Sequence, residues 1–258
     1  MLDLSLYPMI YKRKSFHLFR NLPQASISDS EIREIYAAYE RFEPLMPGIR
    51  TAIRIVPAEE TSCARGQEYC ILLYSEKTEN YLANIGYLGQ QLDLYLVSKN
   101  IGTLWFGIGK VTENTYMGLD YVIMIAIRKV PDDSKFRKDM FKSKRKPLEQ
   151  IWHGEPIVGV SDIVRFSPSA CNTQPWLVVR SGTHLSVYRY KMPEKCGIMP
   201  AKAVSYYNCI DIGIFIYFLN ICLENERISY NIQLHVDPCE DAERTLVAEY
   251  TLDLGGET

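Results

Sequence analysis

Apolar runs alternate with polar, turn-rich stretches along the chain, and their spacing predicts both helices and strands. Residues 29–42 carry apolar side chains at helical spacing, with Ser28 or Asp29 as the N-cap. Residues 81–99 and 206–226 are apolar on most sides, which predicts two long buried helices. A short helix is expected at 161–166, and strands at 51–56, 69–74, 121–127, 177–180, 185–190 and 246–254.

The two long helices also match each other in sequence. Asn84-Ile85-Gly86 corresponds to Asp211-Ile212-Gly213, and the same spacing lays strand 121–127 on residues 248–254. Two further matches precede these in the same order: residues 41–44 with 165–168, and residues 13–16 with 145–148. The repeated order favours an internal duplication. The alternative is two unrelated regions that have helices of similar length. The basic stretch 131–146 is the candidate linker.

Charge and hydropathy narrow the class of protein. The 258-residue chain has a formal net charge of −2, which gives no general attraction to nucleic acid or to an anionic membrane. The apolar run from Ile210 to Leu223 is too short to span a bilayer. Near the N-terminus the basic residues follow the apolar ones, the reverse of the order in a signal peptide. We therefore expect a cytoplasmic protein.

The metal and disulfide signatures of small secreted domains do not occur in the sequence. The seven cysteines are scattered with no C-x-x-C pair, so we expect reduced thiols and no disulfide framework. The four histidines lack metal-ligand spacing, so no metal site is expected. The sequence also lacks a Gly-rich nucleotide loop and a G-x-S-x-G nucleophile motif.

Two motifs remain as candidates for chemistry. Arg13-Lys14-Ser15-x-His17-x-Phe19 puts cations, a hydroxyl and an imidazole within seven residues, a combination that suits a phosphate monoester. An ordinary solvated basic turn is the alternative for this stretch. Residues 167–176, SPSACNTQPW, are rich in small side chains and carboxamides. Such a loop lets a flat ring lie against the backbone while its amides match the edge of a pyrimidine.

The second motif resembles the P-S-A-x-N-x-Q-P-W loop of the FMN-dependent nitroreductase family, and residues 13–19 resemble that family's R-R-S-x-R-x-F phosphate arm. Residues 100–107 are similar to its G-L-G-T-x-W-x-G turn, and residues 145–149 to its R-R-P-L-E tail. The arm and the intact loop lie far apart in the sequence. This order resembles the tandem, fused-dimer subgroup of TM nitroreductases.

The resemblance implies an α+β, nitroreductase-like fold of two tandem, diverged halves, 1–139 and 140–258, with helices around small, mainly antiparallel sheets. In the family, each FMN site takes its arm from one subunit and its loop from the other. Here the first half keeps the arm and only a worn loop, Pro44-Leu45-Met46-Pro47, and the second half has Pro147 where an arm would need serine. One complete site, and a monomeric pseudo-dimer, are expected.

The resemblance also suggests roles for individual residues. The phosphate would be held by Arg13, Lys14, Ser15 and His17, where histidine replaces the family's arginine. Arg145 would return to the phosphate from the linker, and Gly107 would bring its backbone near the reactive flavin N5. The residues expected along the isoalloxazine ring are Pro168, Ser169, Ala170 and Asn172.

The activity implied is that of an FMN-dependent oxidoreductase. NADH or NADPH would reduce the flavin at N5, and a nitroaromatic or quinone would then accept the electrons. No catalytic side chain is assigned, because the flavin carries the chemistry. The alternative is an FMN-binding protein with little turnover, a flavin carrier or redox sensor. Nucleic acid and membrane are not expected as partners.

Overall fold

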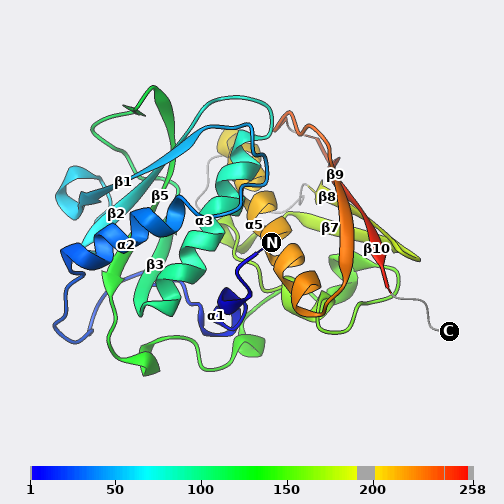
Figure 1. The fold of residues 1–258 in the computed structure, drawn as a ribbon, viewed down its shortest axis with the longest axis horizontal. Helices are drawn as coiled ribbons and strands as arrows, with labels where there is room; N and C mark the ends of the chain where they lie inside the picture. Colours follow the sequence, from blue (N-terminus) through cyan, green and yellow to red (C-terminus); the bar gives the residue numbers. More distant parts are fainter. Residues whose placement is uncertain (1, 191–200, 241, 255–258) are drawn as a thin grey trace. The chain divides into compact units, whose positions relative to one another are not determined.

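The computed structural model describes residues 2–190, 201–240 and 242–254. These residues form two compact units: Asp3–Lys142, and Ser143–Thr258 together with Leu2. Each unit combines one sheet with one long helix (Figure 1). The architecture is α+β with small, mainly antiparallel sheets, as the sequence predicts.

In the first unit, the sheet has the order β1-β2-β5-β3, and all its neighbours are antiparallel. The short strand β4 also pairs with β5. The bounds are β1 Thr51–Pro57, β2 Tyr69–Ser75, β3 Ile101–Phe106, β4 Thr115–Tyr116 and β5 Leu119–Lys129, with helices α1 Met9–Lys12, α2 Asp29–Tyr39 and α3 Tyr81–Ser98.

The second unit has a sheet of the order β6-β7-β8-β10-β9, in which only the β6–β7 pair is parallel. The bounds are β6 Trp152–His153, β7 Trp176–Ser181, β8 His184–Tyr190, β9 Ser229–Leu234 and β10 Arg244–Asp253, with helices α4 Ser161–Val164 and α5 Val204–Asn225. Single 3-10 turns occur across the two units at Leu4–Leu6, Ala58–Glu60, Asp133–Lys135, Met140–Lys142, Leu148–Gln150, Ala170–Asn172 and Ala201–Ala203.

The two units share one chain path. In each, an antiparallel hairpin is followed by the long helix, then by an edge strand, then by a strand that inserts beside the hairpin. Each long helix is also followed, two residues after its end, by a residue with a left-handed backbone conformation. The φ angle is 55° at Asn100 and 59° at Arg227. These two residues are matched by the spacing that aligns the helices, so the backbone supports the proposed duplication.

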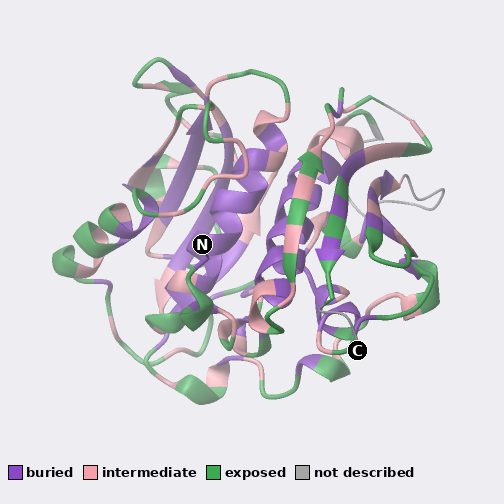
Figure 2. Cartoon of the chain, turned by 45° about the vertical axis from the view of Figure 1, so that its right-hand side comes forward, coloured by how far each residue is buried: buried purple, intermediate pink, exposed green. Residues whose placement is uncertain are grey.

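The local sequence explains the main elements. Ser28 caps α2 in a reciprocal capping box with Glu31, as its position before the helical pattern predicts. Burial runs over most of the length of α3 and α5 (Figure 2). At 22 residues, α5 is longer than the apolar run suggests and is long and apolar enough to cross a membrane. Nevertheless, 89% of its most apolar window is buried, as in the core helix of a folded domain.

Four strands were not predicted: the two-residue strands β4 and β6, and the strands β3 and β9, which occupy equivalent edge positions. β3 follows the left-handed Asn100 directly and contains Gly102, so its sequence suggests a turn. β9 alternates exposed and half-buried residues and has no apolar run. The predicted helices 29–42 and 161–166 are also shorter, ending at Tyr39 and Val164.

The expectation that every cysteine is a reduced thiol is wrong. Cys209, in α5, forms a disulfide with Cys239, which follows β9, across a Cα–Cα distance of 6.1 Å. The sequence gives no hint of this pair, because the chain brings together residues 30 positions apart. Free thiols occur at Cys63, Cys70, Cys171 and Cys222. Cys196 lies outside the described residues.

Gly102 of β3 packs closely against Phe16 of the N-terminal segment, and this contact can be tested by substitution. A Cβ at this position would lie 2.9 Å from both Phe16 Cδ2 and Val130 Cγ2. Gly102→Ala should therefore lower the free energy of unfolding by about 1–3 kcal/mol, the usual cost of overpacking. Gly48→Ala is the matched control, because nothing lies within 4 Å of its new Cβ. Equal thermal midpoints for the two variants would contradict the contact.

Candidate functional site

The predicted phosphate arm runs along the outer edge of β3. Ser15 forms a parallel bridge with Thr103, and the Phe16 amide donates to the Thr103 carbonyl at 2.9 Å. Phe16 and Phe19 point into the core of the first unit, where their rings stack at 5.6 Å. Phe16 and Phe19 therefore anchor the arm in the core, and the backbone at Ser15 and Phe16 is fixed against the strand.

Arg13 is buried and joins a compact polar cluster. Its Nε donates to Asp93 Oδ2 at 2.7 Å, and the Asp93 side chain is fully buried within α3. Thr103 Oγ1 donates to Asp93 Oδ1 at 2.6 Å, and Trp105 Nε1 donates to Oδ2 at 3.0 Å. Three donors thus converge on one carboxylate, which orients the Arg13 guanidinium. The sequence singled out Arg13 but not Asp93, because Asp93 lies within an apolar helix with no motif around it.

Arg137 adds a second positive charge near the Arg13–Asp93 ion pair. Burial is the main cause that lowers the pKa of Arg137 to about 10, and the positive charge of nearby Arg13 is the second cause. The negative charge of Asp93 acts in the opposite direction. Two guanidinium groups therefore lie near one carboxylate, and only that of Arg13 bonds it. Arg13 Nη2 is buried and has no hydrogen-bond partner among the described residues. An anion fits an unpaired buried donor and an excess cation of this kind.

Arg137 is a candidate that sequence reasoning missed. It lies in the stretch predicted as a linker, and its amide donates to the Lys12 carbonyl at 3.1 Å. This backbone contact holds Arg137 beside the start of the arm. The basic composition of residues 131–146 is the only signal in the sequence, and it does not distinguish Arg137 from its neighbours.

The remaining arm residues are more accessible. Lys14 is exposed, and its Nζ donates to the Lys135 carbonyl at 2.9 Å. His17 is exposed, whereas Ser15 is half-buried. Gly107 follows the last residue of β3 and is half-buried in a turn. Within the first unit, the arm residues and Gly107 are therefore all placed along or just beyond β3.

The second motif forms an irregular loop between α4 and β7. Cys171, Asn172 and Gln174 all have left-handed backbone conformations, with φ of 51°, 57° and 49°. Such conformations are uncommon outside glycine and need local support. Ser169 Oγ supplies part of it by accepting from the Gln174 amide at 2.9 Å. Pro168 is buried, Ser169 and Ala170 are half-buried, and Asn172 is exposed.

Helix α5 anchors this loop from one side. The Ala170 amide donates to Asp211 Oδ1 at 3.0 Å, and Thr173 Oγ1 lies 3.5 Å from Asn208 Oδ1. Trp176, where the loop enters β7, stacks on Phe215 of the same helix at a centroid distance of 4.9 Å. The long helix thus fixes both ends of the loop.

The residues that resemble the family's tail support the loop from another side. Arg145 Nη1 donates to Asn172 Oδ1 at 2.9 Å, and Arg145 Nη2 donates to the Phe166 carbonyl at 3.3 Å. The Lys146 amide donates to Gln174 Oε1 at 2.9 Å, and its Nζ to the Thr173 carbonyl at 2.6 Å. The side chains of Asn172 and Gln174 therefore bond the tail, which holds the left-handed turns in place.

Comparison with known proteins shows the family of the chain. A family model described as "Putative TM nitroreductase" matches residues 5–222. The chain belongs to this nitroreductase family. No curated protein matches the sequence.

Among solved structures, a "putative nitroreductase" from Thermotoga maritima is similar to this chain. The match covers 96% of this chain and 92% of the Thermotoga chain, with 18% identity and a TM-score of 0.60. At that identity the likeness shows the fold. A nitroreductase from Desulfovibrio desulfuricans, solved in complex with FMN, covers 60% of this chain and 99% of its own, with 17% identity and a TM-score of 0.43.

This nitroreductase-family chain repeats the loop anchor in its first unit. Asn84 Oδ1 in α3 accepts from the Met46 amide at 2.9 Å, as Asp211 Oδ1 in α5 accepts from the Ala170 amide at 3.0 Å. Asn84 and Asp211 are the residues that the sequence repeat aligns, and Met46 lies in the worn loop. The side chains differ chemically, because one is an amide and the other a carboxyl group.

Asp211 is fully buried, and its Oδ2 has no hydrogen-bond partner among the described residues. Burial raises the pKa of Asp211 well above its usual value, although the bond from the Ala170 amide acts in the opposite direction. The neutral acid is therefore the form that the folded chain favours. Folding stability should fall as pH rises above about 4, where the unfolded chain ionises this group first.

Asp211→Asn should remove that loss, because asparagine keeps the oxygen that holds Ala170 and cannot ionise. We expect the variant to be more stable than the parent chain at pH 7–8, by about 1 kcal/mol or more. The difference should shrink toward pH 4, as measured by urea unfolding across this range. Asp162→Asn, at an exposed position of α4, is the matched control. A pH-independent difference for Asp211→Asn would contradict the assignment.

Proposed function

We propose that this chain is an FMN-dependent oxidoreductase of the nitroreductase type, which takes electrons from NADH or NADPH and passes them to a nitroaromatic or quinone. The observation that carries the proposal is the loop 168–176. Three of its residues hold left-handed conformations, and both α5 and the tail fix them. Folding alone does not require such a loop, whereas a flat ring against its backbone does.

The charged groups of the arm suit the phosphate of FMN. In the first unit, the unpaired Arg13 Nη2 and the excess charge of Arg137 suit a phosphate. Ser15, Lys14 and His17 of the arm are accessible to add further donors. We therefore propose that these groups of the first unit bind the phosphate of FMN.

In the second unit, Pro168, Ser169 and Ala170 would lie along the isoalloxazine ring. Asn172 would contribute through its backbone, because its side chain bonds Arg145. We accordingly assign Arg145 a positioning role in the loop and Arg137 a direct role at the phosphate.

Bound FMN supplies a two-electron carrier that accepts and returns a hydride at N5. The contribution of the chain is binding, orientation and electrostatics. The Arg13 and Arg137 cations would offset the phosphate charge, and Asp93 would keep Arg13 in position through its buried ion pair. Small side chains at Ser169 and Ala170 would leave room for a nicotinamide, and afterwards an acceptor, above the same ring.

The proposal is tested by mixing the FMN-loaded chain with NADH or NADPH without oxygen. We expect the oxidised flavin absorbance to bleach with one equivalent of reductant and to return on adding a nitroaromatic or quinone. Bleaching in seconds and return in seconds support an enzyme. A stoichiometric flavin that neither nucleotide reduces within hours would instead indicate a flavin carrier or sensor, and would overturn the proposed activity.

We also propose that the chain acts as a monomer. Its two units share one chain path, so one chain contains two similar units, as a dimer of single-unit chains would. Light scattering on the FMN-loaded protein should give a mass near 29.7 kDa. Twice that mass would contradict this part of the proposal.

A further inference from the structure

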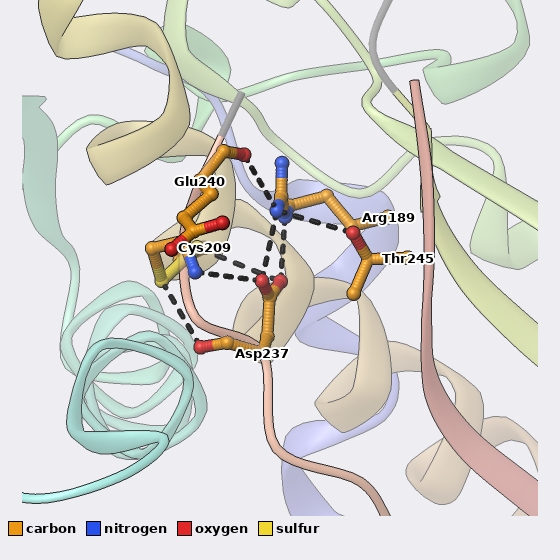
Figure 3. Close-up of a disulfide and its surroundings, with 6 residues drawn as sticks. Arg189, Cys209, Asp237, Glu240 and Thr245 are labelled. Carbon is orange, nitrogen blue, oxygen red and sulfur yellow. Dashed lines mark hydrogen bonds and ion pairs between the residues drawn. A yellow bond between two sulfur atoms is a disulfide. The ribbon is translucent and has the colours of Figure 1, made fainter. Parts of the chain in front are cut away.

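The second unit contains a sulfur pair that the proposed flavin chemistry does not use. Cys209 lies near the start of α5 and is almost completely buried, whereas Cys239 follows β9 and is half-buried. The disulfide lies beside a charged pair, Arg189 of β8 and Asp237 (Figure 3). Cys239 is therefore the more exposed of the two cysteines, and Cys209 lies beside the buried Asp237 carboxylate.

The segment that carries Cys239 is held without the disulfide. Arg189 Nε donates to Asp237 Oδ2 at 2.5 Å, and Arg189 Nη2 donates to Asp237 Oδ1 at 2.8 Å. Arg189 Nη2 also donates to the Glu240 carbonyl at 3.1 Å and to Thr245 Oγ1 at 3.3 Å. Because these bonds join the segment to Arg189 of β8, which also bonds Thr245 of β10, we expect Cys239 to stay in place when the sulfur bond breaks.

Hydrogen-bond acceptors for both thiols are also in place. Cys209 Sγ lies 3.6 Å from Asp237 Oδ2, and Cys239 Sγ lies 3.6 Å from the Asp237 carbonyl oxygen. These distances suit S–H donors. The Cys239 amide donates to Asp237 Oδ1 at 2.8 Å, which fixes the carboxylate further. The same surroundings therefore satisfy the oxidised pair and two reduced thiols.

A metal ion fits the same three residues less well. Cys209, Asp237 and Cys239 offer ligand atoms within 4.8 Å of one another. However, the Arg189 guanidinium already occupies both Asp237 oxygens, and its positive charge would repel a cation. Binding a metal through Asp237 would require Arg189 to become a buried, unpaired charge.

We propose that Cys209 and Cys239 form a reversible thiol–disulfide site that exchanges electrons with dithiols. The thiolate of a dithiol attacks the Cys239 sulfur, the Cys209–Cys239 bond breaks, and Cys209 leaves as a thiolate that takes the proton released by the attacking thiol. The second thiolate of the reductant then attacks the reductant's own sulfur in the mixed disulfide, and Cys239 leaves as a thiolate that takes the second proton. Two thiols form on the chain as the dithiol becomes a disulfide, and two electrons are transferred.

The site lies next to the anchors of the loop 168–176. Cys209 is flanked in α5 by Asn208 and Asp211, which contact Thr173 and Ala170. Opening the pair therefore removes a covalent constraint from the helical segment that holds this loop. The inference itself does not depend on a bound flavin.

The test uses the native, full chain equilibrated in buffers with different ratios of reduced to oxidised dithiothreitol. The thiols are trapped with acid and then alkylated, and peptide mass mapping reports each cysteine separately. We expect Cys209 and Cys239 to become labelled together as the ratio rises, with circular dichroism unchanged, and to close again when the ratio is reversed. Cys222, a buried free thiol of the same helix, is the internal control and should be labelled after acid unfolding at every ratio.

Two results would overturn the inference. One is a pair that stays closed at every ratio until the chain unfolds, which would make the disulfide purely structural. The other is a pair that remains fully labelled even in oxidised dithiothreitol.

The positioning role of Asp237, whose oxygens accept from both thiols, is tested by Asp237→Asn, which should shift the dithiothreitol ratio at half-reduction at least several-fold. Cys239→Ser should leave Cys209 labelled at all ratios. Both readouts are independent of FMN, so they are separate from the proposed function.

Discussion

Replacing Asp93 by asparagine should lower the free energy of unfolding by about 3–5 kcal/mol, because it leaves the buried Arg13 cation without a counter-charge. Both side chains are almost fully buried, at 4% exposure for Arg13 and 0% for Asp93. Asparagine can still accept from Thr103 or Trp105, but it cannot neutralise the guanidinium. The loss is measured by urea unfolding followed by far-ultraviolet circular dichroism.

Asp133→Asn is the matched control for that experiment. Asp133 pairs with Lys12 in the same unit, but its side chain is 70% exposed. Exposed ion pairs contribute about 0–1 kcal/mol, so the control should unfold almost as the parent chain does. If the two variants lose the same small amount, the Arg13–Asp93 pair does not hold the arm in position.

The second large effect is expected at Arg189. Arg189→Met should also cost about 3–5 kcal/mol, since it leaves the Asp237 carboxylate buried with no cation. The Arg189 side chain is 2% exposed and the Asp237 side chain 7%. The same urea titration measures the loss.

A double-mutant cycle separates this charge effect from the loss of packing. Removing the charge of Asp237 as well, in Arg189→Met with Asp237→Asn, should recover part of the stability, with a coupling energy of about 1–3 kcal/mol. Additive losses from the two single variants would show that the pair is not coupled, and that Arg189 contributes only through packing.

Hydrophobic spacing was sufficient to predict most of the regular elements. Strands β2 and β5 and helices α3 and α5 are apolar over most of their length, so their positions followed from sequence. Strand β9 was not predicted, because its residues alternate between exposed and half-buried and it has no continuous apolar run. The hydrogen bonds that define it come from β10, which follows it along the chain.

The sequence indicates those parts of the candidate site that lie in short continuous motifs. It does not indicate the residues that pair with partners distant in the sequence. The arm and the loop each occupy a continuous stretch, and their small or charged residues are visible in sequence. Asp93, Arg137 and Asp211 are isolated polar residues whose partners lie far away along the chain. Only the folded unit shows that Arg13 has a buried counter-ion and that Asp211 holds a loop amide.

The most direct test of the account compares FMN with riboflavin, which lacks the phosphate, by fluorescence titration of the flavin-free chain. We predict one FMN per chain, bound at least tenfold more tightly than riboflavin. Arg137→Gln should abolish that preference, because a charged hydrogen bond to phosphate contributes about 1.5–3 kcal/mol. Ala170→Leu should weaken both ligands equally, and Lys142→Gln, at an 84% exposed position, should change neither. A chain that binds no FMN, or that binds FMN and riboflavin equally, would contradict the central claim.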